Sequence, residues 1–378
     1  MKIGLVCPYN IERSGGVLEV ILALKEGLEK RGHTCKIITP YPRNHEFEAQ
    51  PDVIFVGTST DFRTLSFSDT TSQVSSAGET EKIDAMLADE QFDILHFHEP
   101  WMPLLSRQLV QRSTCVNIGT FHAKVSDARM SRAILKVVAP YLKSVMKYLH
   151  ELTAVSPAGA EYAANMTEQP ITIIPNGIDI KKYRGTGAKV KADPETILFV
   201  GRLERRKGVQ YLLRAYGQIA QDHPDIKLII AGDGPERERL ELMAEDLHLP
   251  NVSFLGFVSE DLKIELLRQA SLFCSPAVFG ESFGIVLLEA MATDTVCVAG
   301  NNAGYTEVMQ DLGAISIVNP HDTDEFARRL ELLLYQQDLR ALWQKWAKSY
   351  VKQFDYPDVV AKYEEFYKEA LERHGQAR

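Results

Sequence analysis

The sequence lacks any long hydrophobic run. None of its uncharged apolar stretches approaches the roughly 18 residues needed to span a bilayer. The apolar run from Ile3 to Cys7 ends at Pro8, and it is too short for the core of a signal peptide, which needs about 7–15 residues. We therefore expect a cytosolic protein.

Cysteine is also scarce, and it shows no ligand spacing. The chain has five cysteines, with no C-x-x-C pair and no Cys/His pattern typical of zinc sites. Each lies in an apolar, strand-like context, which predicts buried, reduced thiols. They are Cys7, Cys35, Cys115, Cys274 and Cys297.

Positive charge is not in excess. Lys and Arg number 42 against 51 Asp and Glu, which gives a net charge of −9 and argues against broad nucleic-acid binding. At 45% hydrophobic and 25% charged residues the composition is that of an ordinary globular protein. By the soft prior of about 150 residues per domain, 378 residues predict two domains.

Strand-like and helix-like segments alternate through most of the chain. The strand 2–8, a Gly15-Gly16 turn, the helix 17–31 and the strand 35–39 predict a parallel sheet with right-handed crossovers. A second such series follows, with strands at 197–200, 227–231, 252–255, 271–274, 295–299 and 314–318. The fold class expected is α/β, with two doubly wound, Rossmann-like domains.

We predict an N-terminal domain at 1–175, a linker at 176–193, a C-terminal domain at 194–356 and a final helix at 357–378 that packs back on the first domain. The Ser- and Thr-rich stretch 58–80 has no periodicity and predicts a long, mobile insertion. Open parallel sheets bind ligands beyond the carboxyl ends of their strands. Two such domains predict a cleft with Gly15-Gly16 on one side and the segment 281–289 on the other.

Two carboxylates flank a predicted helix start in the C-terminal half. Glu281 precedes Gly284, Glu289 follows it, and the apolar run after Gly284 predicts a helix. The free N–H groups of a helix N-terminus favour an anion. Carboxylates that accept from hydroxyls beside such an anion site are suited to a nucleotide sugar.

Cations and glycines supply the remaining phosphate contacts. Arg202 and Lys207 follow a predicted strand end and are suited to neutralising a diphosphate, whereas Arg205 and Arg206 are interpreted as part of a solvated loop. The alternative for the whole segment is a solvated basic loop. The Gly15-Gly16 pair lets backbone N–H groups approach a phosphate, or it forms a structural turn. It is not the G-x-G-x-x-G of dinucleotide sites.

A carboxylate near residue 260 is a candidate for reading the base. Glu260 follows the strand 252–255 and can accept from guanine N1–H and N2–H₂. The alternative is a capping box with Ser259 as the N-cap, and the two are compatible.

Histidines close two predicted strands. His122 is a candidate donor to a sugar hydroxyl, whereas His96 is interpreted as a hydrogen-bonded structural residue. A metal pair of His96 and His98 has thin support, because only Glu99 lies nearby in sequence.

A basic stripe lies between residues 129 and 147. At 100° per residue its five cations share one face, and apolar residues occupy the opposite face, with Pro140 predicted to kink or split the helix. The pattern suits an anionic membrane surface, and the alternative is the solvated face of a packed helix. The cations are Arg129, Arg132, Lys136, Lys143 and Lys147.

Taken together, these motifs resemble the retaining glycosyltransferases of family 4, which have the GT-B fold. The resemblance covers nearly the whole chain. It rests on the motifs Ile3–Tyr9, Gly15–Val17, His96–Pro100, Thr120–His122, Ile174–Asp179, Gly201-Arg202, Lys207-Gly208 and the E-x₇-E segment 281–289. Within the family, the pattern is similar to enzymes that transfer mannose to phosphatidylinositol.

The resemblance implies a role for each matching position. Arg202 and Lys207 bind the donor phosphates, Glu281 holds the donor sugar, and His122 lies near the transferred sugar. Glu289 takes the ribose hydroxyls. The other implied donor contacts are Gly15, Gly16, Val258, Glu260, Lys263, Phe283, Gly284 and Ile285, and the acceptor-side residues are Tyr9, Asn10 and Trp101.

The implied donor is GDP-mannose, the implied acceptor is a glycolipid or lipid of the phosphatidylinositol type, and neither a tightly bound cofactor nor a protein-bound metal is required. The implied location is the cytoplasm or the inner face of the plasma membrane. The segment 79–84 is acidic, where lipid-acting relatives carry a basic helix, and Trp101 replaces a small polar residue. Three alternatives stay open: a UDP-sugar enzyme with a soluble or polyprenyl-linked acceptor, a UDP-sugar epimerase, which the E-x₇-E segment fits less well than transfer, and a nucleotide-sugar-binding protein without turnover.

Overall fold

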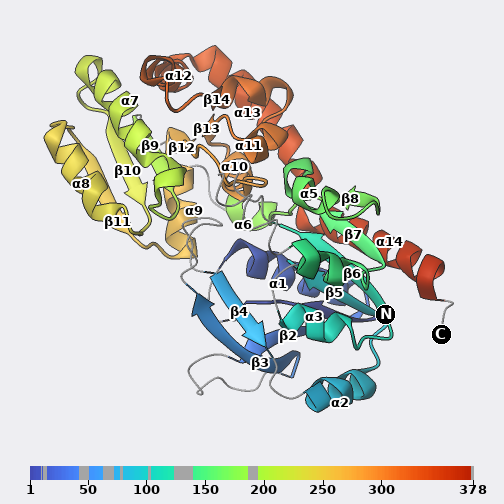
Figure 1. Ribbon diagram of the computed structural model, residues 1–378. Helices are drawn as coiled ribbons and strands as arrows, with labels where there is room; N and C mark the ends of the chain where they lie inside the picture. The colour runs from blue at the N-terminus through green and yellow to red at the C-terminus, as the bar shows by residue number, and fades with distance from the viewer. Residues whose placement is uncertain are drawn as a thin grey trace. The chain divides into compact units, whose positions relative to one another are not determined.

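The computed structural model describes residues 1–9, 11, 15–41, 51–62, 72–76, 80–100, 104–122, 139–185 and 195–375 (Figure 1). The chain forms two compact units. Unit 1 comprises Met1–Gly177 together with Tyr356–Arg378, and unit 2 comprises Ile178–Asp355. The chain therefore passes between the units twice, and its last helix belongs to the unit that contains its first strand.

Unit 1 is built on an eight-stranded sheet. Every neighbouring pair is parallel except β3 and β4. The strand order reverses direction between β1 and β5, so their carboxyl ends mark the switch point at which such sheets bind ligands. From one edge to the other the strands are β4 (Ser72–Ser76), β3 (Val53–Phe62), β2 (Thr34–Tyr41), β1 (Lys2–Val6), β5 (Ile94–His98), β6 (Val116–Phe121), β7 (Glu151–Ala154) and β8 (Ile171–Ile173).

Where the structure describes the Ser- and Thr-rich stretch 58–80, the chain is not irregular, and for this part the prediction of a mobile insertion was wrong. Its first residues complete β3, and residues 72–76 form β4, which pairs antiparallel with β3 from Thr58 opposite Ser76 to Phe62 opposite Ser72. Backbone hydrogen bonding between the two strands needs no hydrophobic alternation, and β-branched threonine suits a strand. Residues 63–71 and 77–79 lie outside the described part of the chain.

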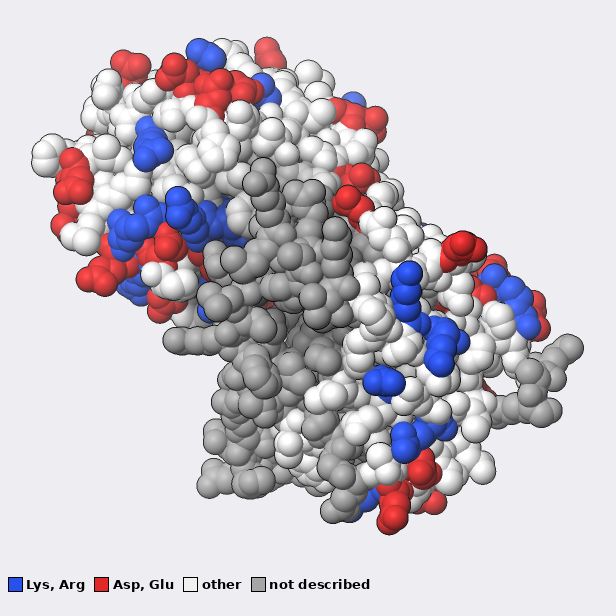
Figure 2. All heavy atoms as spheres, in the orientation of Figure 1, with Lys and Arg blue, Asp and Glu red and all other residues white. Residues whose placement is uncertain are grey.

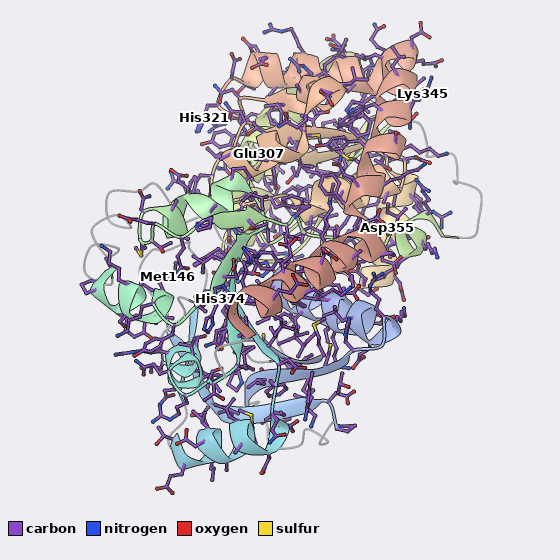
Figure 3. All side chains as sticks on the ribbon, turned by 90° about the vertical axis from the view of Figure 1, so that its right-hand side faces the viewer. Met146, Glu307, His321, Lys345, Asp355 and His374 are labelled. Atoms are coloured by element: carbon purple, nitrogen blue, oxygen red, sulfur yellow. The ribbon has the colours of Figure 1, made fainter. Side chains whose placement is uncertain are left out.

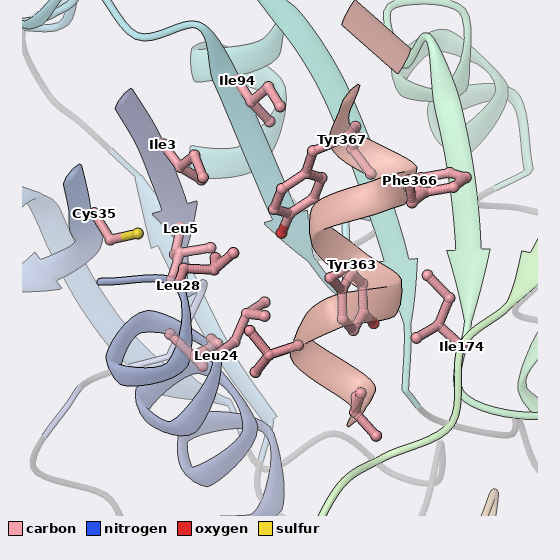
Figure 4. Packing of buried hydrophobic residues seen from close by; sticks show 14 of the residues in the cluster. Ile3, Leu5, Leu24, Leu28, Cys35, Ile94, Ile174, Tyr363, Phe366 and Tyr367 are labelled. Carbon is pink, nitrogen blue, oxygen red and sulfur yellow. The ribbon is translucent and has the colours of Figure 1, made fainter. Parts of the chain in front are cut away.

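Helices cover both faces of this sheet. On one face, α1 (Gly16–Lys30) and α14 (Tyr356–His374) pack against β1, with Leu24 and Leu28 of α1 and Tyr363 and Tyr367 of α14 in the same core (Figure 4). Figure 3 shows α14 running from the neighbourhood of Asp355 to His374. The other face is covered by α2 (Thr80–Glu90), α3 (Leu105–Val110), α5 (Pro157–Ala164) and the helix 139–146.

Unit 2 contains a six-stranded sheet whose strand pairs are all parallel. The strand order reverses between β9 and β12, which is the doubly wound order expected from the sequence. Across the sheet the strands are β11 (Val252–Gly256), β10 (Lys227–Ala231), β9 (Thr196–Val200), β12 (Leu272–Ser275), β13 (Val296–Gly300) and β14 (Ile317–Val318).

The helices of unit 2 follow these strands in alternation. The predicted linker 176–193 contains a short helix, α6, which begins unit 2. The helices are α6 (Ile180–Arg184), α7 (Val209–Asp222), α8 (Arg237–Asp246), α9 (Glu260–Gln269), α10 (Ile285–Ala292), α11 (Ala303–Val308), α12 (Thr323–Tyr335) and α13 (Gln337–Tyr350), with 3₁₀ turns η1 (Arg205–Lys207), η2 (Asp311–Ser316) and η3 (Val351–Phe354).

The sequence-based prediction for the cysteines is confirmed. All five are buried and free. Burial raises the pKa of the Cys7 thiol to about 12, which leaves it protonated and unreactive at neutral pH. Within the described ranges, no helix combines the length and the apolar character needed to cross a bilayer. Lys and Arg are interspersed with Asp and Glu over the visible face of each unit (Figure 2).

Candidate functional site

Two loops at the switch point of unit 2 carry the best-formed polar cluster. The first follows β9 and the second follows β12, which are neighbouring strands. Gly208, at φ 77°, closes the first loop, and a Cβ there would lie 2.1 Å from the carbonyl oxygen of Pro276 in the second. Only glycine permits so close an approach of the two backbones. The sheet therefore places both loops where doubly wound folds bind ligands.

Glu281 binds two cations from the first loop. Its Oε1 lies 2.6 Å from Arg206 Nη1 and 2.8 Å from Lys207 Nζ. Burial raises the pKa of this carboxyl, but the charges of Lys207 and Arg206 outweigh burial and hold the pKa below its ordinary value. Glu281 is therefore a carboxylate at neutral pH, and the cluster brings together two of the residues predicted to act in catalysis, Lys207 and Glu281.

Arg206 does not lie in a solvated loop, and that interpretation was wrong. Its side chain is 12% exposed, and its Nε donates to Glu204 Oε2 at 2.8 Å. Glu204 is fully buried, so it can carry a charge only with a paired cation beside it. Arg202 is 44% exposed and lies 3.2 Å from Glu204 Oε1 rather than near Glu281. Arg205 is exposed, as the solvated-loop interpretation expects.

The helix α10 begins at Ile285, directly after Gly284, as the sequence predicts. Gly284 is the N-cap, at φ 109°, and it offers no side-chain cap to the first free N–H groups of the helix. A Cβ on Gly284 would lie 2.7 Å from the ring of Tyr305, which is buried beneath the loop and contacts Ser275 Oγ at 2.7 Å. Phe283 is buried and Ile285 is half-buried.

Glu289, on the second turn of α10, belongs to a separate cluster. It is 4% exposed, and its Oε1 accepts from Tyr183 Oη at 2.7 Å and from Lys263 Nζ at 2.9 Å. Glu260 shares both donors, because its Oε1 lies 2.8 Å from Tyr183 Oη and its Oε2 lies 2.8 Å from Lys263 Nζ. Lys182 adds a further contact to Glu260 at 3.1 Å.

Burial raises the pKa of Glu260, but Lys263, Tyr183 and Lys182 together lower it to about 2. Ser259 is the N-cap of α9 and accepts from the backbone N–H of Leu262, which confirms the capping interpretation. Val258 precedes this cap and is half-buried.

Unit 1 carries a buried histidine cluster beside its own switch point. His96 Nδ1 lies 2.7 Å from Tyr367 Oη, and its Nε2 lies 2.6 Å from Thr120 Oγ1. Both ring nitrogens are therefore paired, which confirms the interpretation of His96 as a hydrogen-bonded structural residue. Burial lowers the pKa of His96 to about 3, so the ring is neutral at physiological pH.

His122 follows β6 and contacts His98 and Glu99. Its Nε2 lies 2.8 Å from His98 Nδ1, and its backbone N–H donates to Glu99 Oε1 at 2.8 Å. Burial lowers the pKa of His122 to about 4. Glu99 is fully buried and has φ 53°, a conformation that is uncommon for a non-glycine residue and that occurs at functional sites.

The structure shows few contacts for the remaining predicted site residues of unit 1. Gly15 and Gly16 are exposed at the start of α1, and a Cβ on Gly15 would meet nothing within 4 Å. The backbone oxygen of Tyr9 accepts from Thr39 Oγ1 at 2.8 Å. Asn10 and Trp101 lie outside the described residues.

Part of the predicted basic stripe is described. Lys143 and Lys147 are exposed, and the apolar residues predicted to face inward, Leu142, Val145, Met146 and Leu149, are buried. The other cations of the stripe, Arg129, Arg132 and Lys136, fall outside the described ranges. So does the stretch before Pro140, where a kink is predicted.

Sequence reasoning missed Arg206, Glu204, Tyr183 and Tyr305. No local pattern marks them. Arg206, Tyr183 and Tyr305 gain their places through contacts between segments far apart in the chain, and Glu204 contacts Arg202 and Arg206 of its own loop. Across the described residues, no group of three or more His, Cys, Asp or Glu side chains is arranged to hold a metal ion.

Comparisons with known proteins agree with this arrangement. The profile described as "Glycosyltransferase Family 4" matches residues 14–182, and "Glycosyl transferases group 1" matches residues 186–350. Phosphatidyl-myo-inositol mannosyltransferase from Mycolicibacterium smegmatis is 30% identical over 96% of this chain and 92% of its own length. Residue for residue, the similarity extends over both units.

Solved structures show the same fold. Sucrose-phosphate synthase from Thermosynechococcus elongatus matches with a TM-score of 0.79 at 20% identity, over 98% of this chain and 99% of its own. HepE from Anabaena, in complex with UDP and glucose, matches with a TM-score of 0.77 at 19% identity, over 98% of this chain and 100% of its own. The chain belongs to the family 4 glycosyltransferases and has the GT-B fold.

Proposed function

We propose that this glycosyltransferase transfers mannose from GDP-mannose to a phosphatidylinositol-type lipid, with retention of the anomeric configuration. The observation that carries the transfer chemistry is the ion-paired cluster of Glu281 with Lys207 and Arg206 at the switch point of unit 2. The names of relatives at about 30% identity support the sugar and the acceptor.

The donor diphosphate needs positive charge and backbone donors. Lys207 is already held at the site by Glu281, and Arg202 is exposed enough to reach a ligand. The N-terminus of α10, at Gly284 and Ile285, adds uncapped N–H groups and the positive end of the helix dipole. These groups would stabilise the charge that develops on the leaving diphosphate.

Glu281 is suited to hold hydroxyls of the donor sugar. Both cations contact its Oε1, so Oε2 is the oxygen that a sugar hydroxyl can reach without displacing either of them. In the proposed step the acceptor oxygen bonds to the anomeric carbon on the face from which the diphosphate leaves. The acceptor's proton passes to the leaving phosphate oxygen, so no protein base is needed. In unit 1, we assign to His122 a neutral imidazole contact with a sugar hydroxyl.

Glu289 would accept hydrogen bonds from the ribose hydroxyls, with Gly16, Val258 and Lys263 as further contacts to the nucleotide sugar.

Glu260 is less suited to recognising guanine than its position in the sequence suggests. When Tyr183 donates to Glu260, this carboxylate accepts from Tyr183, Lys182 and Lys263, which leaves about one of its roughly four lone-pair sites. A bidentate contact with guanine N1–H and N2–H₂ needs two. This observation favours a second candidate function, a UDP-sugar enzyme with a soluble or polyprenyl-linked acceptor.

A lipid acceptor requires contact with a membrane surface. Lys143, on the outer side of the helix 139–146, and Lys147, in the turn after it, are both exposed, whereas the inner side of the helix is buried. This geometry suits anionic lipid headgroups. Asp84 of the acidic helix α2 lies 3.2 Å from Arg112, so part of its charge is compensated within unit 1. We propose that the lysine face, rather than α2, meets the membrane.

A transfer assay tests the function directly. The full chain is incubated with phosphatidylinositol vesicles and GDP-mannose, UDP-glucose or UDP-N-acetylglucosamine, with Glu281→Ala as the inactive control. Transfer from GDP-mannose alone supports the proposal. Transfer from a UDP sugar supports the second candidate. Nucleotide-sugar binding without turnover to phosphatidylinositol or to a polyprenyl phosphate would instead indicate a binding protein.

Vesicle flotation tests the membrane contact. Charge reversal by Lys143→Glu with Lys147→Glu should abolish binding to anionic vesicles. Lys345→Glu with Lys348→Glu is the matched control, because it makes the same charge change at two exposed lysines on α13 of unit 2 (Lys345 is labelled in Figure 3). Equal loss in both variants would point to net charge rather than to the lysine face.

A further inference from the structure

The hydroxyl of Tyr183 contacts two carboxylates at once. Tyr183 Oη lies 2.7 Å from Glu289 Oε1 and 2.8 Å from Glu260 Oε1. Tyr183 and Glu289 are 5% and 4% exposed, so little water reaches the contact. The tyrosine comes from α6, the first helix of unit 2, and the two carboxylates come from α9 and α10.

The protons in this cluster do not suffice for every contact. A tyrosine hydroxyl has one proton, so it donates to Glu289 or to Glu260 but never to both. Lys263 has three protons and contacts both carboxylates, at 2.9 Å and 2.8 Å. Lys182 contacts Glu260 only. Glu289 therefore depends on Tyr183 and Lys263, whereas Glu260 retains two ammonium groups when the tyrosine proton points elsewhere.

We propose that Tyr183 is a positioning residue of the donor site. Its hydroxyl donates a hydrogen bond to Glu289 while the site is empty, and it donates to Glu260 instead when ligand hydroxyls bind Glu289. The inference rests on the proposed function, because that function assigns Glu289 to the ribose of the donor. Two ribose hydroxyls bring new donors to Glu289. Glu260 then accepts the hydrogen bond from the tyrosine hydroxyl without any change of position, since its Oε1 is already 2.8 Å from Tyr183 Oη.

This arrangement makes a specific demand on the nucleotide. A ligand without ribose hydroxyls cannot replace the tyrosine proton at Glu289, so it gains nothing from the exchange. Tyr183 should therefore contribute to the preference for a ribonucleotide over its dideoxy counterpart. A tyrosine that merely packs beneath the site would affect both ligands equally.

The test measures dissociation constants of the full chain for GDP, UDP and their 2′,3′-dideoxy forms by calorimetry. We expect the wild type to prefer the ribonucleotide by about tenfold or more, as two hydrogen bonds to a charged group predict. Tyr183→Phe should weaken ribonucleotide binding about five- to tenfold and leave dideoxynucleotide binding within about twofold. In the transfer assay it should raise KM for the donor with little change in kcat.

Tyr216→Phe is the matched control. Tyr216 is another buried tyrosine of unit 2, and its hydroxyl donates to one of two nearby carbonyl oxygens, those of Ile226 and Pro250, and to neither carboxylate. Its removal should lower Tm and leave the ribose preference intact. An unchanged ribose preference in Tyr183→Phe overturns the inference, and so does equal weakening of both ligands.

Glu289→Gln distinguishes an error in the ribose assignment of Glu289 from an error in the role of Tyr183. If this variant keeps the ribose preference, the assignment of Glu289 in the proposed function is wrong. If it loses the preference while Tyr183→Phe keeps it, only the role of Tyr183 is wrong. A wild type that binds neither GDP nor UDP contradicts both.

Discussion

His98 Nδ1 lies 2.8 Å from His122 Nε2, in a part of unit 1 where both rings are buried. Between two imidazoles one ring donates and the other accepts, so this contact is lost when both rings gain a second proton. Burial lowers the pKa of His98 well below its ordinary value, and the charges of His96 and His122 act in the same direction. The cluster is thus built for neutral histidines.

Acid should destabilise the protein between about pH 6.5 and 4.5. His96 and His122 have pKa values lowered from 6.5 to about 3 and about 4, so in this window the unfolded chain binds protons that the folded chain does not. Stability then falls as pH falls, by up to about 1.4 kcal/mol per pH unit per histidine. Scanning calorimetry at several pH values should show Tm decreasing across this window.

Replacing His96 with a residue that cannot be protonated tests whether the histidines cause the pH dependence of Tm. His96→Gln should flatten the dependence of Tm on pH, although it lowers Tm at pH 7. Glu260 and Glu364, whose pKa values are lowered to about 2, lose their stabilising effect mainly below about pH 4.5, which keeps them out of the window. A Tm that is constant or rises from pH 6.5 to 4.5 would contradict the prediction.

Glu281→Gln should remove sugar transfer while leaving nucleotide binding. The amide keeps the size of the side chain but not its charge, so Lys207 loses an ion pair whereas Arg206 retains Glu204. We expect kcat to fall about 10²–10³-fold, the usual cost of removing one transition-state contact. Glu331→Gln, which disrupts a surface pair with His223, is the control and should leave kcat unchanged.

Much of the fold follows from local patterns in the sequence. The helix after Gly284 follows the Phe279-Gly280 turn and begins with four apolar residues, and the strand Ile94–His98 is apolar except for its histidines. Parallel β–α–β units then leave few topologies, since crossovers have one hand. The β3–β4 pair was missed because most residues in its paired segments, 58–62 and 72–76, are polar, and composition does not record backbone pairing.

The candidate site was predictable in some of its members but not in its pairings. Spacing identified Glu281, Glu289 and Lys207, whereas nothing in the sequence indicated that Arg206 rather than Arg202 contacts Glu281. In the sequence, Tyr183 lies 77 residues from Glu260 and 106 residues from Glu289, the two carboxylates that it contacts. Such contacts depend on the tertiary fold, which brings α6, α9 and α10 together.

Gly304→Ala should impair both stability and transfer. A Cβ at Gly304 would lie 2.4 Å from the carbonyl oxygen of Glu281 and 2.6 Å from the N of Phe283, and both contacts are backbone atoms. The loop that positions Glu281 would have to shift, at a cost of about 1–3 kcal/mol or more. We expect a lower Tm together with a kcat reduced at least several-fold.

Gly217→Ala provides the control for this glycine substitution. Its Cβ would meet only the flexible end of Leu249, at 2.9 Å, and alanine favours the α7 helix by about 0.5–1 kcal/mol. Its Tm should be unchanged or slightly raised, with full activity. If Gly304→Ala behaved in the same way, close packing of α11 against the Glu281 loop would not be what positions that residue.

Tyr367→Phe should loosen α14 from the sheet of unit 1. Tyr367 Oη pairs with His96 Nδ1 at 2.7 Å, and both residues are fully buried, so the substitution leaves an imidazole nitrogen unpaired at a cost of about 1–3 kcal/mol. Hydrogen–deuterium exchange should accelerate in peptides from α14 and β5.

Tyr335→Phe is the control, because Tyr335 Oη has no hydrogen-bond partner among the described residues and the loss of this hydroxyl should cost little stability. Since α14 is the last helix of the chain and packs beside the first strand, accelerated exchange confined to α14 and β5 would show that this one hydrogen bond helps to close unit 1. Unchanged exchange would mean that apolar contacts alone hold the helix.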